Sequence, residues 1–401
     1  MNSPHISTAP PVALTRSVII LLFARTILDT GYRAVYPFLP FIAADLNVSV
    51  ESAARIIQIR NLTGFLSPVF GPLTDRYGRR VMMLLGLAIL AVMGVALYFV
   101  TSLWVAMIVI PIMGLATILF VPAQQAFLGD NVPYAERGRV MAIAEVAWSL
   151  AAIIGLPLVG ILVQTQGWRV GFVTIGLFAA LSFALMWFAL PHEKRNAEHA
   201  ARAMGGSYRE ALRAPMALAV IGTIALMAGA NEMININYGA WMHTSFGLDA
   251  IALGFIGSAI GGAEFAAQMV VALFVDRMGK WKMVGGSLVL GGVAYLALAF
   301  LGGSVLLGTI GLVAAFLMFE LAIVAALPLI TEIAPNARAT LLSMGVAGFS
   351  FGRAAGSFAG PALYVNYGFG VTSLIAAAGI LVACVIWFIF VREKHQGAIA
   401  A

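Results

Sequence analysis

The stretch Gly71-Pro72-Leu73-Thr74-Asp75-Arg76-Tyr77-Gly78-Arg79-Arg80 lies between two apolar runs, at residues 53–70 and 81–100. Each run has about the 20 residues that a helix needs to cross a bilayer. A segment this charged between two such runs is expected to be a short turn in water. Its core of Asp-Arg-x-Gly and a basic residue recurs 201 positions later, at Asp276-Arg277-Met278-Gly279-Lys280. This interval predicts an internal repeat.

The composition is that of an integral membrane protein. Of the 401 residues 62% are apolar and 10% are charged, and the mean hydropathy is +0.98. A water-soluble core of this size could not bury so much apolar surface. The apolar runs lack the alternation of outer-membrane strands, so helices are the expected spanning element. We count twelve spans, at residues 16–40, 53–72, 81–100, 103–128, 140–163, 169–190, 216–242, 251–274, 283–301, 304–331, 340–364 and 369–391.

The net charge of +6 is explained by membrane topology. With the N-terminus in the cytoplasm, most Lys and Arg residues fall in the inner segments, whereas only Arg55 and Arg169 lie near the outer ends. This is the positive-inside bias, and it predicts cytoplasmic N- and C-termini in a plasma (bacterial inner) membrane. A nucleic-acid partner is not expected. Cys384 is the only cysteine, which excludes an intramolecular disulfide and a thiolate metal cluster.

The repeat divides the chain into two halves. The offset of 201 also relates Arg137 to Arg338, Gly155 to Gly356 and Gly167 to Gly368. The one long polar connector is Pro191 to Pro215. We therefore predict an N-terminal six-helix bundle at 1–190, a cytoplasmic linker at 191–215 and a C-terminal six-helix bundle at 216–401, related by pseudo-symmetry.

Three motifs resemble the twelve-helix transporters of the major facilitator superfamily (MFS), in particular their drug/proton antiporter branch. Gly71 to Arg80 resembles the signature loop of the superfamily, Gly155-Leu156-Pro157-Leu158-Val159-Gly160 the motif of the antiporter branch, and Tyr36 to Leu46 the end of its first span. Ile110 departs from the pattern, because the branch has an arginine there. The resemblance implies an all-α MFS fold of two six-helix bundles and a monomeric secondary transporter that works by alternating access on a small-molecule substrate. It implies no cofactor, with a proton gradient as the driving force.

Five polar side chains of the first span fall within one wedge of about 100° around the helix. Charges near the bilayer centre cost about 2.5–3.5 kcal/mol each, so they normally face a cavity or one another. We expect this face to line a substrate cavity. The alternative is an internal ladder in which Asp29 pairs with Arg25 and Arg33, four residues away on either side, only to neutralise its own charge. The five residues are Arg25, Asp29, Tyr32, Arg33 and Tyr36.

A second polar cluster lies in the seventh span, which the repeat relates to the first. It consists of Asn231, Glu232, Asn235 and Tyr238. We expect these residues to line the cavity, with Arg60 of the second span adding positive charge. An unwound helix at the asparagines is the alternative.

The candidates for proton coupling are carboxylates, because no histidine is expected at mid-membrane depth. They are Asp29, Glu264 and Glu320, with Arg353 at a similar depth. A carboxylate without a partner could load and release a proton near neutral pH, whereas one paired with Arg353 would stay charged. A structural ion pair is the alternative for each. We expect Glu145, near the inner end of its span, to pair with inner-loop arginines.

By the resemblance, the signature loop is a cytoplasmic gate. Asp75 would approach the inner end of the eleventh span, and Arg76 or Arg79 would reach an acid such as Asp130. The second copy, which lacks the first glycine, is expected to be a weaker latch. The predicted gate residues are Gly71, Asp75, Arg76, Gly78, Arg79, Asp130, Asp276 and Arg277.

Glycines repeat every four residues in the eleventh span, at Gly348, Gly352, Gly356 and Gly360. Such spacing lets a neighbouring helix approach closely. We expect packing to be their main role and a hinge the second.

The function that fits best is proton-coupled export of a small organic, amphiphilic or partly anionic compound. An importer or uniporter of an organic anion or zwitterion is the alternative, favoured by Arg25, Arg33 and Arg60 and by Ile110. An enzyme is not expected, because no nucleophile and histidine match in depth and neither metal-ligand spacing nor a Gly-x-Ser-x-Gly elbow occurs. A receptor without transport would bind a ligand that never crosses the bilayer.

Overall fold

The computed structural model describes residues 11–190, 216–333 and 338–391. Every regular element in these ranges is a helix, as the sequence predicts. The chain forms two compact units. Of the described residues, the first unit holds 11–48, 66–190 and 250–261, and the second holds 49–65, 216–249, 262–333 and 338–391. The predicted linker at 191–215 lies outside the described residues, and the division into 1–190 and 216–401 stays a prediction.

The first unit is a bundle of long helices with a 3₁₀ turn (η2) and a short π-helix (η3). Helix α4 lies between α5 and α8, and α1 packs on α8, α6 and α5. The first 12 residues of α13 belong to this unit and pack near α7. The elements are α1 (Pro11–Asp45), α3 (Ser67–Tyr77), α4 (Arg79–Ala96), η2 (Leu97–Phe99), α5 (Leu103–Asn131), α6 (Tyr134–Leu150), η3 (Ala151–Gly155), α7 (Leu156–Gln166) and α8 (Trp168–Ala189).

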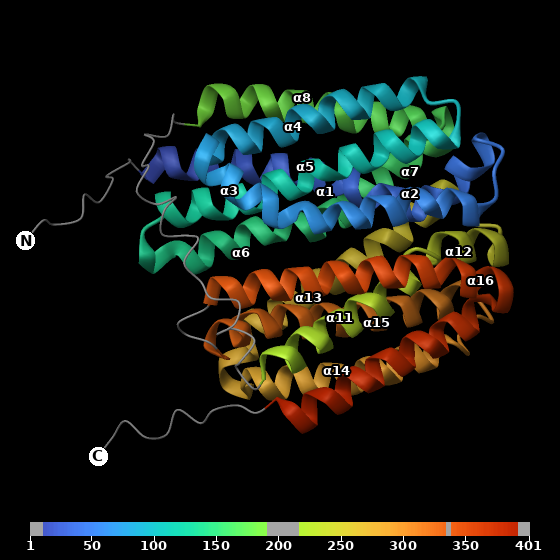
Figure 1. Ribbon diagram of the computed structural model, residues 1–401. Coiled ribbons are helices and arrows are strands. Elements are labelled where there is room, and N and C mark those ends of the chain that lie inside the picture. Colours follow the sequence, from blue (N-terminus) through green and yellow to red (C-terminus); the bar gives the residue numbers. More distant parts are fainter. Residues whose placement is uncertain (1–10, 191–215, 334–337, 392–401) are drawn as a thin grey trace, which may run out of the picture. The chain divides into compact units, whose positions relative to one another are not determined.

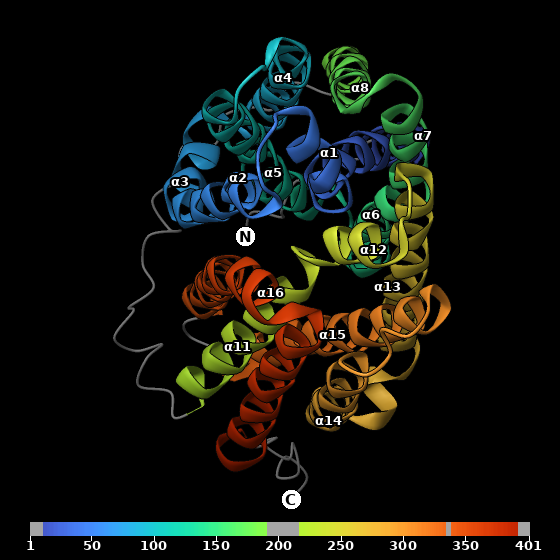
Figure 2. The same cartoon turned by 90° about the vertical axis from the view of Figure 1, so that its right-hand side faces the viewer.

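The second unit is organised around the pair α11 and α16, which lie side by side in both views (Figures 1 and 2). Helix α14 packs on α15 and α16, and α2 packs on α16. The elements are α2 (Val50–Thr63), the 3₁₀ turn η1 (Gly64–Leu66), α11 (Ala217–Asn235), α12 (Tyr238–Phe246), α13 (Ala250–Met278, from residue 262 on), α14 (Lys280–Leu298), α15 (Val305–Ile333) and α16 (Arg338–Phe390).

Within the described residues, nine helical stretches are long and apolar enough to cross a membrane. One of them, Leu341–Phe390, is divided by non-helical backbone at Gly368, between the last two predicted spans. Helix α1 is not among the nine, and its polar character comes from Arg25, Asp29 and Arg33. The second predicted span is broken by η1. The count of twelve spans stays a prediction.

The expectation that Gly71 to Arg80 is a turn is wrong for most of its length. Helix α3 continues through Tyr77, and α4 begins at Arg79, so that Gly78 alone (φ 94°, ψ 147°) reverses the chain. An apolar run marks the part of a helix that lies in the bilayer, whereas backbone hydrogen bonds let the helix continue into water. The charged residues therefore lie on helix ends.

Backbone geometry confirms the internal repeat. Gly78 and Gly279 both adopt positive φ (94° and 83°), as do Gly167 and Gly368 (88° and 83°). The members of each pair are 201 positions apart, which is the interval found in the sequence. In this backbone region a Cβ atom is strained, so glycine is favoured. Each of the four ends one helical segment and starts the next.

The glycine stripe of α16 packs on α11, as the spacing predicts. A Cβ at Gly352 would collide with the carbonyl oxygen of Ala225, and one at Gly356 with that of Gly229. A Cβ at Gly348 would lie 2.7 Å from the Ile221 side chain. The two backbones are thus in direct contact.

At one pair of equivalent positions in the repeat, the side chain contacts the end of a later helix in both units, but the residue type differs. In the first unit the Arg80 guanidinium lies over the Trp187 ring and donates to the Trp187 carbonyl. Trp281 stands at the equivalent position in the second unit. Its Nε1 donates to the Val391 carbonyl at 2.7 Å, and its ring packs edge-on against Phe388.

Candidate functional site

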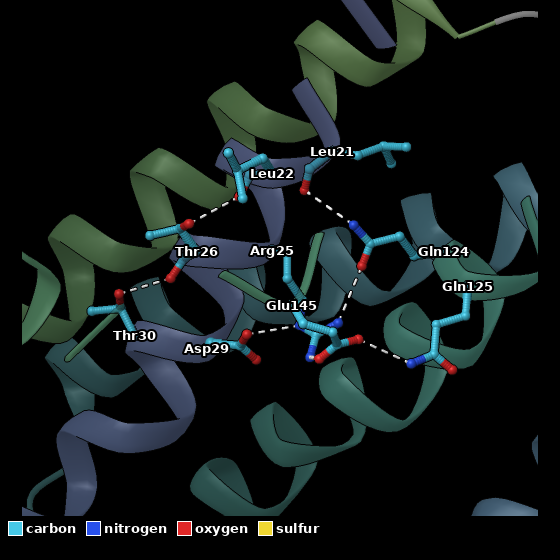
Figure 3. A network of polar contacts seen from close by, with 9 residues as sticks. All are labelled: Leu21, Leu22, Arg25, Thr26, Asp29, Thr30, Gln124, Gln125 and Glu145. Atoms are coloured by element: carbon cyan, nitrogen blue, oxygen red, sulfur yellow. Dashed lines mark hydrogen bonds and ion pairs between the residues drawn. The ribbon is translucent and has the colours of Figure 1, made fainter. Parts of the chain in front are cut away.

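A buried polar network surrounds Arg25 in the first unit (Figure 3). Arg25 Nε lies 2.7 Å from Asp29 Oδ2, one turn along α1. Arg25 Nη1 donates to Gln124 Oε1 on α5 at 3.2 Å, and Gln124 Nε2 reaches the Leu21 carbonyl at 3.5 Å. Arg25 is 5% exposed, and Asp29 and Gln124 are fully buried. The pairing of Asp29 with Arg25 agrees with one of the two contacts in the alternative, a ladder in which Asp29 pairs with Arg25 and Arg33.

Glu145 on α6 completes this network and corrects our expectation for that residue. Its Oε2 lies 3.6 Å from Arg25 Nη2, and its Oε1 accepts a hydrogen bond from Gln125 Nε2 at 3.1 Å. The partner is therefore an arginine within the first span instead of an inner-loop arginine. The Glu145 side chain is 44% exposed, in contrast to that of Asp29. One guanidinium thus has two carboxylates, one buried and one accessible.

Arg33 takes a different partner from Arg25. Its guanidinium lies 4.4 Å from the centroid of the Trp148 ring, at a distance typical of a cation–π contact. The Tyr32 ring lies 6.4 Å from the same tryptophan. Arg33 is 8% exposed and Tyr36 is 3% exposed. The α1 face that the sequence predicts is therefore polar and mostly buried, and its role as a cavity wall stays a prediction.

A second network surrounds Glu232 of α11, in the second unit. Glu232 Oε1 accepts from Asn61 Nδ2 of α2 at 2.8 Å, and Glu232 Oε2 lies 2.9 Å from Arg353 Nε of α16. Glu232 is 1% exposed. Gln58 Nε2 of α2 also donates to the Ser357 carbonyl of α16 at 3.1 Å. Glu232 therefore links three helices.

The remaining predicted residues of the seventh span lie near the end of α11. Asn231 Nδ2 donates to Tyr295 Oη at 3.0 Å, and the Tyr238 ring packs edge-on against Phe316. Asn235 is the last residue of α11, and α12 begins at Tyr238. The helix is thus interrupted next to the asparagines, as the alternative reading of this cluster predicts.

The other buried residues among the predicted charged candidates are all in the second unit. Glu320 Oε1 accepts from Gln268 Nε2 at 3.0 Å and is 8% exposed. Glu264 is 4% exposed and Arg60 is 2% exposed. Arg353, which the sequence places at a similar depth to Glu264 and Glu320, pairs with Glu232. Their part in proton coupling stays a prediction.

At the predicted gate, Arg79 at the start of α4 is ion-paired with Asp130 near the end of α5. Arg76 is exposed and lies 5.5 Å from the Tyr77 ring. The side chain of Asp75 and the surroundings of Gly71 lie outside what the structure describes. Asp276 and Arg277 are exposed at the end of α13. Gating itself stays a prediction.

A third polar cluster lies at the last residue of α1, beyond the predicted first span. Asp45 Oδ2 lies 2.6 Å from Arg169 Nη1 and accepts from Trp168 Nε1 at 3.0 Å. Arg169 also donates twice to the Val100 carbonyl, at 2.9 and 2.7 Å. Partial burial opposes the charge of Asp45, but the hydrogen bonds from Arg169 and Trp168 outweigh it and lower the pKa of Asp45. This cluster ties α1, α8 and the end of η2 together.

Sequence reasoning missed the uncharged partners of these networks, namely Gln124, Gln125, Asn61 and Trp148. A search of the spans for ionisable side chains passes over amides, although an amide in an apolar span also needs a partner. Gln124, next to Gln125, and Asn61, next to Arg60, could have been found as amides within predicted spans. Trp148 carries no such signal. In the described ranges, no group of three His, Cys, Asp or Glu residues is placed to hold a metal ion.

Comparisons with known proteins agree with these observations. The family model of the "Major Facilitator Superfamily" matches residues 21–228 and 220–401. The chain is 26% identical over 373 residues to Multidrug resistance protein 1 of Bacillus subtilis (strain 168), covering 90% of this chain and 94% of that protein. It is 26% identical over 294 residues to a "Probable L-galactonate transporter" of Escherichia coli (strain K12), covering 68% of this chain and 63% of that protein.

The fold is similar to that of a solved structure described as a bacterial homolog to the human lysosomal transporter Spinster. The TM-score is 0.75 at 15% sequence identity, over 95% of this chain and 97% of that one. At this identity the likeness concerns the fold alone. The family model, in contrast, matches nearly the whole chain. The chain therefore belongs to the Major Facilitator Superfamily and is a multi-pass membrane transporter, not an enzyme.

Proposed function

We propose that this transporter exports a small organic, amphiphilic or partly anionic compound in exchange for protons. The observation that carries the proposal is the shared guanidinium of Arg25, which contacts the buried Asp29 and the half-exposed Glu145. The multidrug name of the Bacillus subtilis relative supports export of amphiphilic compounds.

The charges of this network favour the uptake of one proton. Asp29, Glu145 and Arg25 together carry a formal charge of −1 when both acids are ionised, and one proton makes the set neutral. Charge is costly in a low-dielectric surrounding, so such a set responds strongly to a single proton. Arg33, the other charged group on this face of α1, lies over Trp148.

Asp29 is the best placed of the proposed proton carriers. Its Oδ2 faces Arg25, whereas its Oδ1 is buried and accepts no hydrogen bond from the part of the chain that the structure describes. When a proton binds Asp29, Glu145 remains within reach of Arg25 as an anionic partner. In the antiporter branch an arginine stands at the position of Ile110, on α5. In this proposal Arg25 of α1 takes its role, so Ile110 does not argue against proton coupling.

The test is transport by purified protein in liposomes under an imposed pH gradient, with a panel of fluorescent amphiphilic dyes. We expect dye accumulation to follow the gradient in the natural protein. Asp29→Asn should abolish this accumulation and keep dye exchange without a gradient, because exchange needs no net proton movement. Glu51→Gln, at an exposed carboxylate in the first turn of α2 and outside these networks, is the control and should keep the gradient-driven accumulation. Dye flux that is indifferent to the gradient in the natural protein would overturn proton coupling.

An importer or uniporter of an organic anion or zwitterion is the second candidate. It is supported by the buried Arg33 and Arg60 and by the sugar-acid name of the Escherichia coli relative. Uptake of a labelled sugar acid that is unaffected by the pH gradient and lost in Arg33→Gln would favour this function over export.

We further propose, from the charge bias and the family, a plasma (bacterial inner) membrane location with both termini in the cytoplasm. We also propose that the protein is a monomer whose partners are a small-molecule substrate and the lipid bilayer. No cofactor and no nucleic acid belong to this proposal. Labelling of single cysteines introduced at both termini, from either side of right-side-out vesicles, tests the topology.

A further inference from the structure

The antiporter-type motif of the fifth span lies at a break in the helix. Residues Ala151–Gly155 form the π-helix η3, and Pro157 is in the first turn of α7. A π turn shifts the hydrogen-bond register by one residue, and proline has no N–H to donate. Such a break leaves carbonyl groups without their usual helical donors.

Two carbonyl groups are affected. In a regular α-helix the Ala152 carbonyl accepts from residue 156 and the Ile153 carbonyl from residue 157. Here the N–H of Leu156 is donated to the Ala151 carbonyl instead. Residue 157 is proline. Ala152 and Ile153 therefore lose the donors that a regular helix would supply.

Ser258, on the first part of α13, faces these carbonyls. Its Oγ lies 2.8 Å from the Ile153 carbonyl oxygen and 3.4 Å from that of Ala152. All of these residues belong to the first unit. A hydroxyl has one proton, so the shorter contact is the hydrogen bond and the longer one a weak second contact.

The surroundings hold Ser258 at this place. A Cβ at Gly254 would lie 2.8 Å from the Leu156 carbonyl oxygen, and one at Gly261 would collide with the Ala152 side chain. The N–H of Ala250 is bound by Gln164 Oε1 at 3.1 Å. The start of α13 thus lies directly against η3 and α7, with Ser258 at the break.

The break also contacts α1. A Cβ at Gly155, the last residue of η3, would collide with the Thr30 hydroxyl, and Thr30 directly follows Asp29 in α1. The π turn is therefore in contact with α13 on one side and with the Asp29 region of α1 on another.

We propose that Ser258 is a positioning residue of the transport cycle, which caps the carbonyl exposed by Pro157 and thereby fixes the helix break beside Thr30. Ser258 touches no substrate in this role. It acts through the geometry of η3, so its loss lowers the maximal transport rate and leaves substrate affinity unchanged.

The test is a double-mutant cycle of Ser258→Ala and Pro157→Ala. In liposomes, with the fluorescent amphiphilic dyes as the transported probe, Ser258→Ala should lower the maximal transport rate severalfold at unchanged KM. Ser258→Thr, which keeps the hydroxyl, should retain the rate. Pro157→Ala returns an N–H that can bind the Ile153 carbonyl within the helix. In that background we expect Ser258→Ala to have little further effect.

The melting temperatures of the natural protein, the two single variants Ser258→Ala and Pro157→Ala and their double variant are compared as well. This second measurement gives the coupling between the two positions even if Pro157→Ala stops transport. Ser287→Ala is the control, because Ser287 is buried, whereas Ser258 is half-buried, and Ser287 donates to Met283 O in its own helix. It should change neither rate nor melting temperature appreciably. Additive effects of Ser258→Ala and Pro157→Ala, or a rate in Ser258→Ala equal to that of the natural protein, would overturn the proposal.

Discussion

The Glu232 carboxylate lies 2.9 Å from Nε of Arg353, although 121 positions separate the two residues in the chain. Glu232 is almost completely buried, so this pair places a charge where water cannot solvate it. Asn61 supplies the second contact.

We predict that Arg353→Ala destabilises the protein by about 3–5 kcal/mol, because it removes the cation that lies 2.9 Å from the buried carboxylate. The double variant Arg353→Ala/Glu232→Gln should recover most of this loss, since no charge then remains. Thermal unfolding of the purified proteins measures both. Equal destabilisation by the single and double variants would mean that packing, not charge, is the cause.

Variants of the Arg79–Asp130 pair can distinguish an effect on gating from an effect on stability. Its side chains are 22% and 52% exposed, and exposed ion pairs contribute only about 0–1 kcal/mol. We predict that Arg79→Asp lowers transport more than tenfold with little change in melting temperature and ligand affinity. The charge exchange Arg79→Asp/Asp130→Arg should restore part of the rate. A double variant as slow as Arg79→Asp would exclude the pair as a latch.

The contact between α11 and α16 predicts opposite effects of the same substitution at two glycines. Gly352→Ala forces a methyl group against the Ala225 carbonyl, and overpacking typically costs about 1–3 kcal/mol. Gly222→Ala, on α11, meets nothing within 4 Å, and helix propensity favours it by about 0.5–1 kcal/mol. Melting temperatures should therefore fall for the first and hold or rise for the second. The reverse order would contradict the close approach of the two helices.

The Asp45 cluster predicts a pH dependence of stability. A carboxyl whose pKa is lower in the folded than in the unfolded chain stabilises the fold above its unfolded pKa of about 3.9. This contribution is lost as the pH falls through the lower, folded value. Asp45→Asn should therefore lower the melting temperature at pH 6 and have no effect at the acid end of the range. Asp276→Asn, at an exposed site, is the control, and an Asp45→Asn effect that persists unchanged in acid would disprove the charge contribution.

The architecture could be read from the sequence because the bilayer imposes simple rules. Apolar length gives the helices, and a shared interval gives the repeat that Gly78 and Gly279 confirm in the backbone. The helix ends were misplaced near Gly71, because hydrophobicity reports where a helix meets water and not where its hydrogen bonds stop.

The partners of buried charges could not be read in the same way. Their similar depth in the membrane suggested Glu264 or Glu320 as the ion-pair partner of Arg353. Depth alone does not identify a partner, because helix packing decides which neighbour each side chain faces. The glycine stripe of α16 brings Arg353 to α11, and hence to Glu232. Likewise Glu145 faces Arg25 because α6 packs on α1, a contact that no local pattern in the sequence encodes.

The contrast between Arg80 and Trp281 has a consequence for tracing ancestry. Both side chains reach a main-chain oxygen near the end of a later helix, yet an alignment that scores residue types treats them as unrelated. The glycines with positive φ, in contrast, keep the interval of 201 positions between the two halves. For distant relatives of this chain, landmarks of backbone conformation should thus preserve a record of gene duplication after the side chains have lost it.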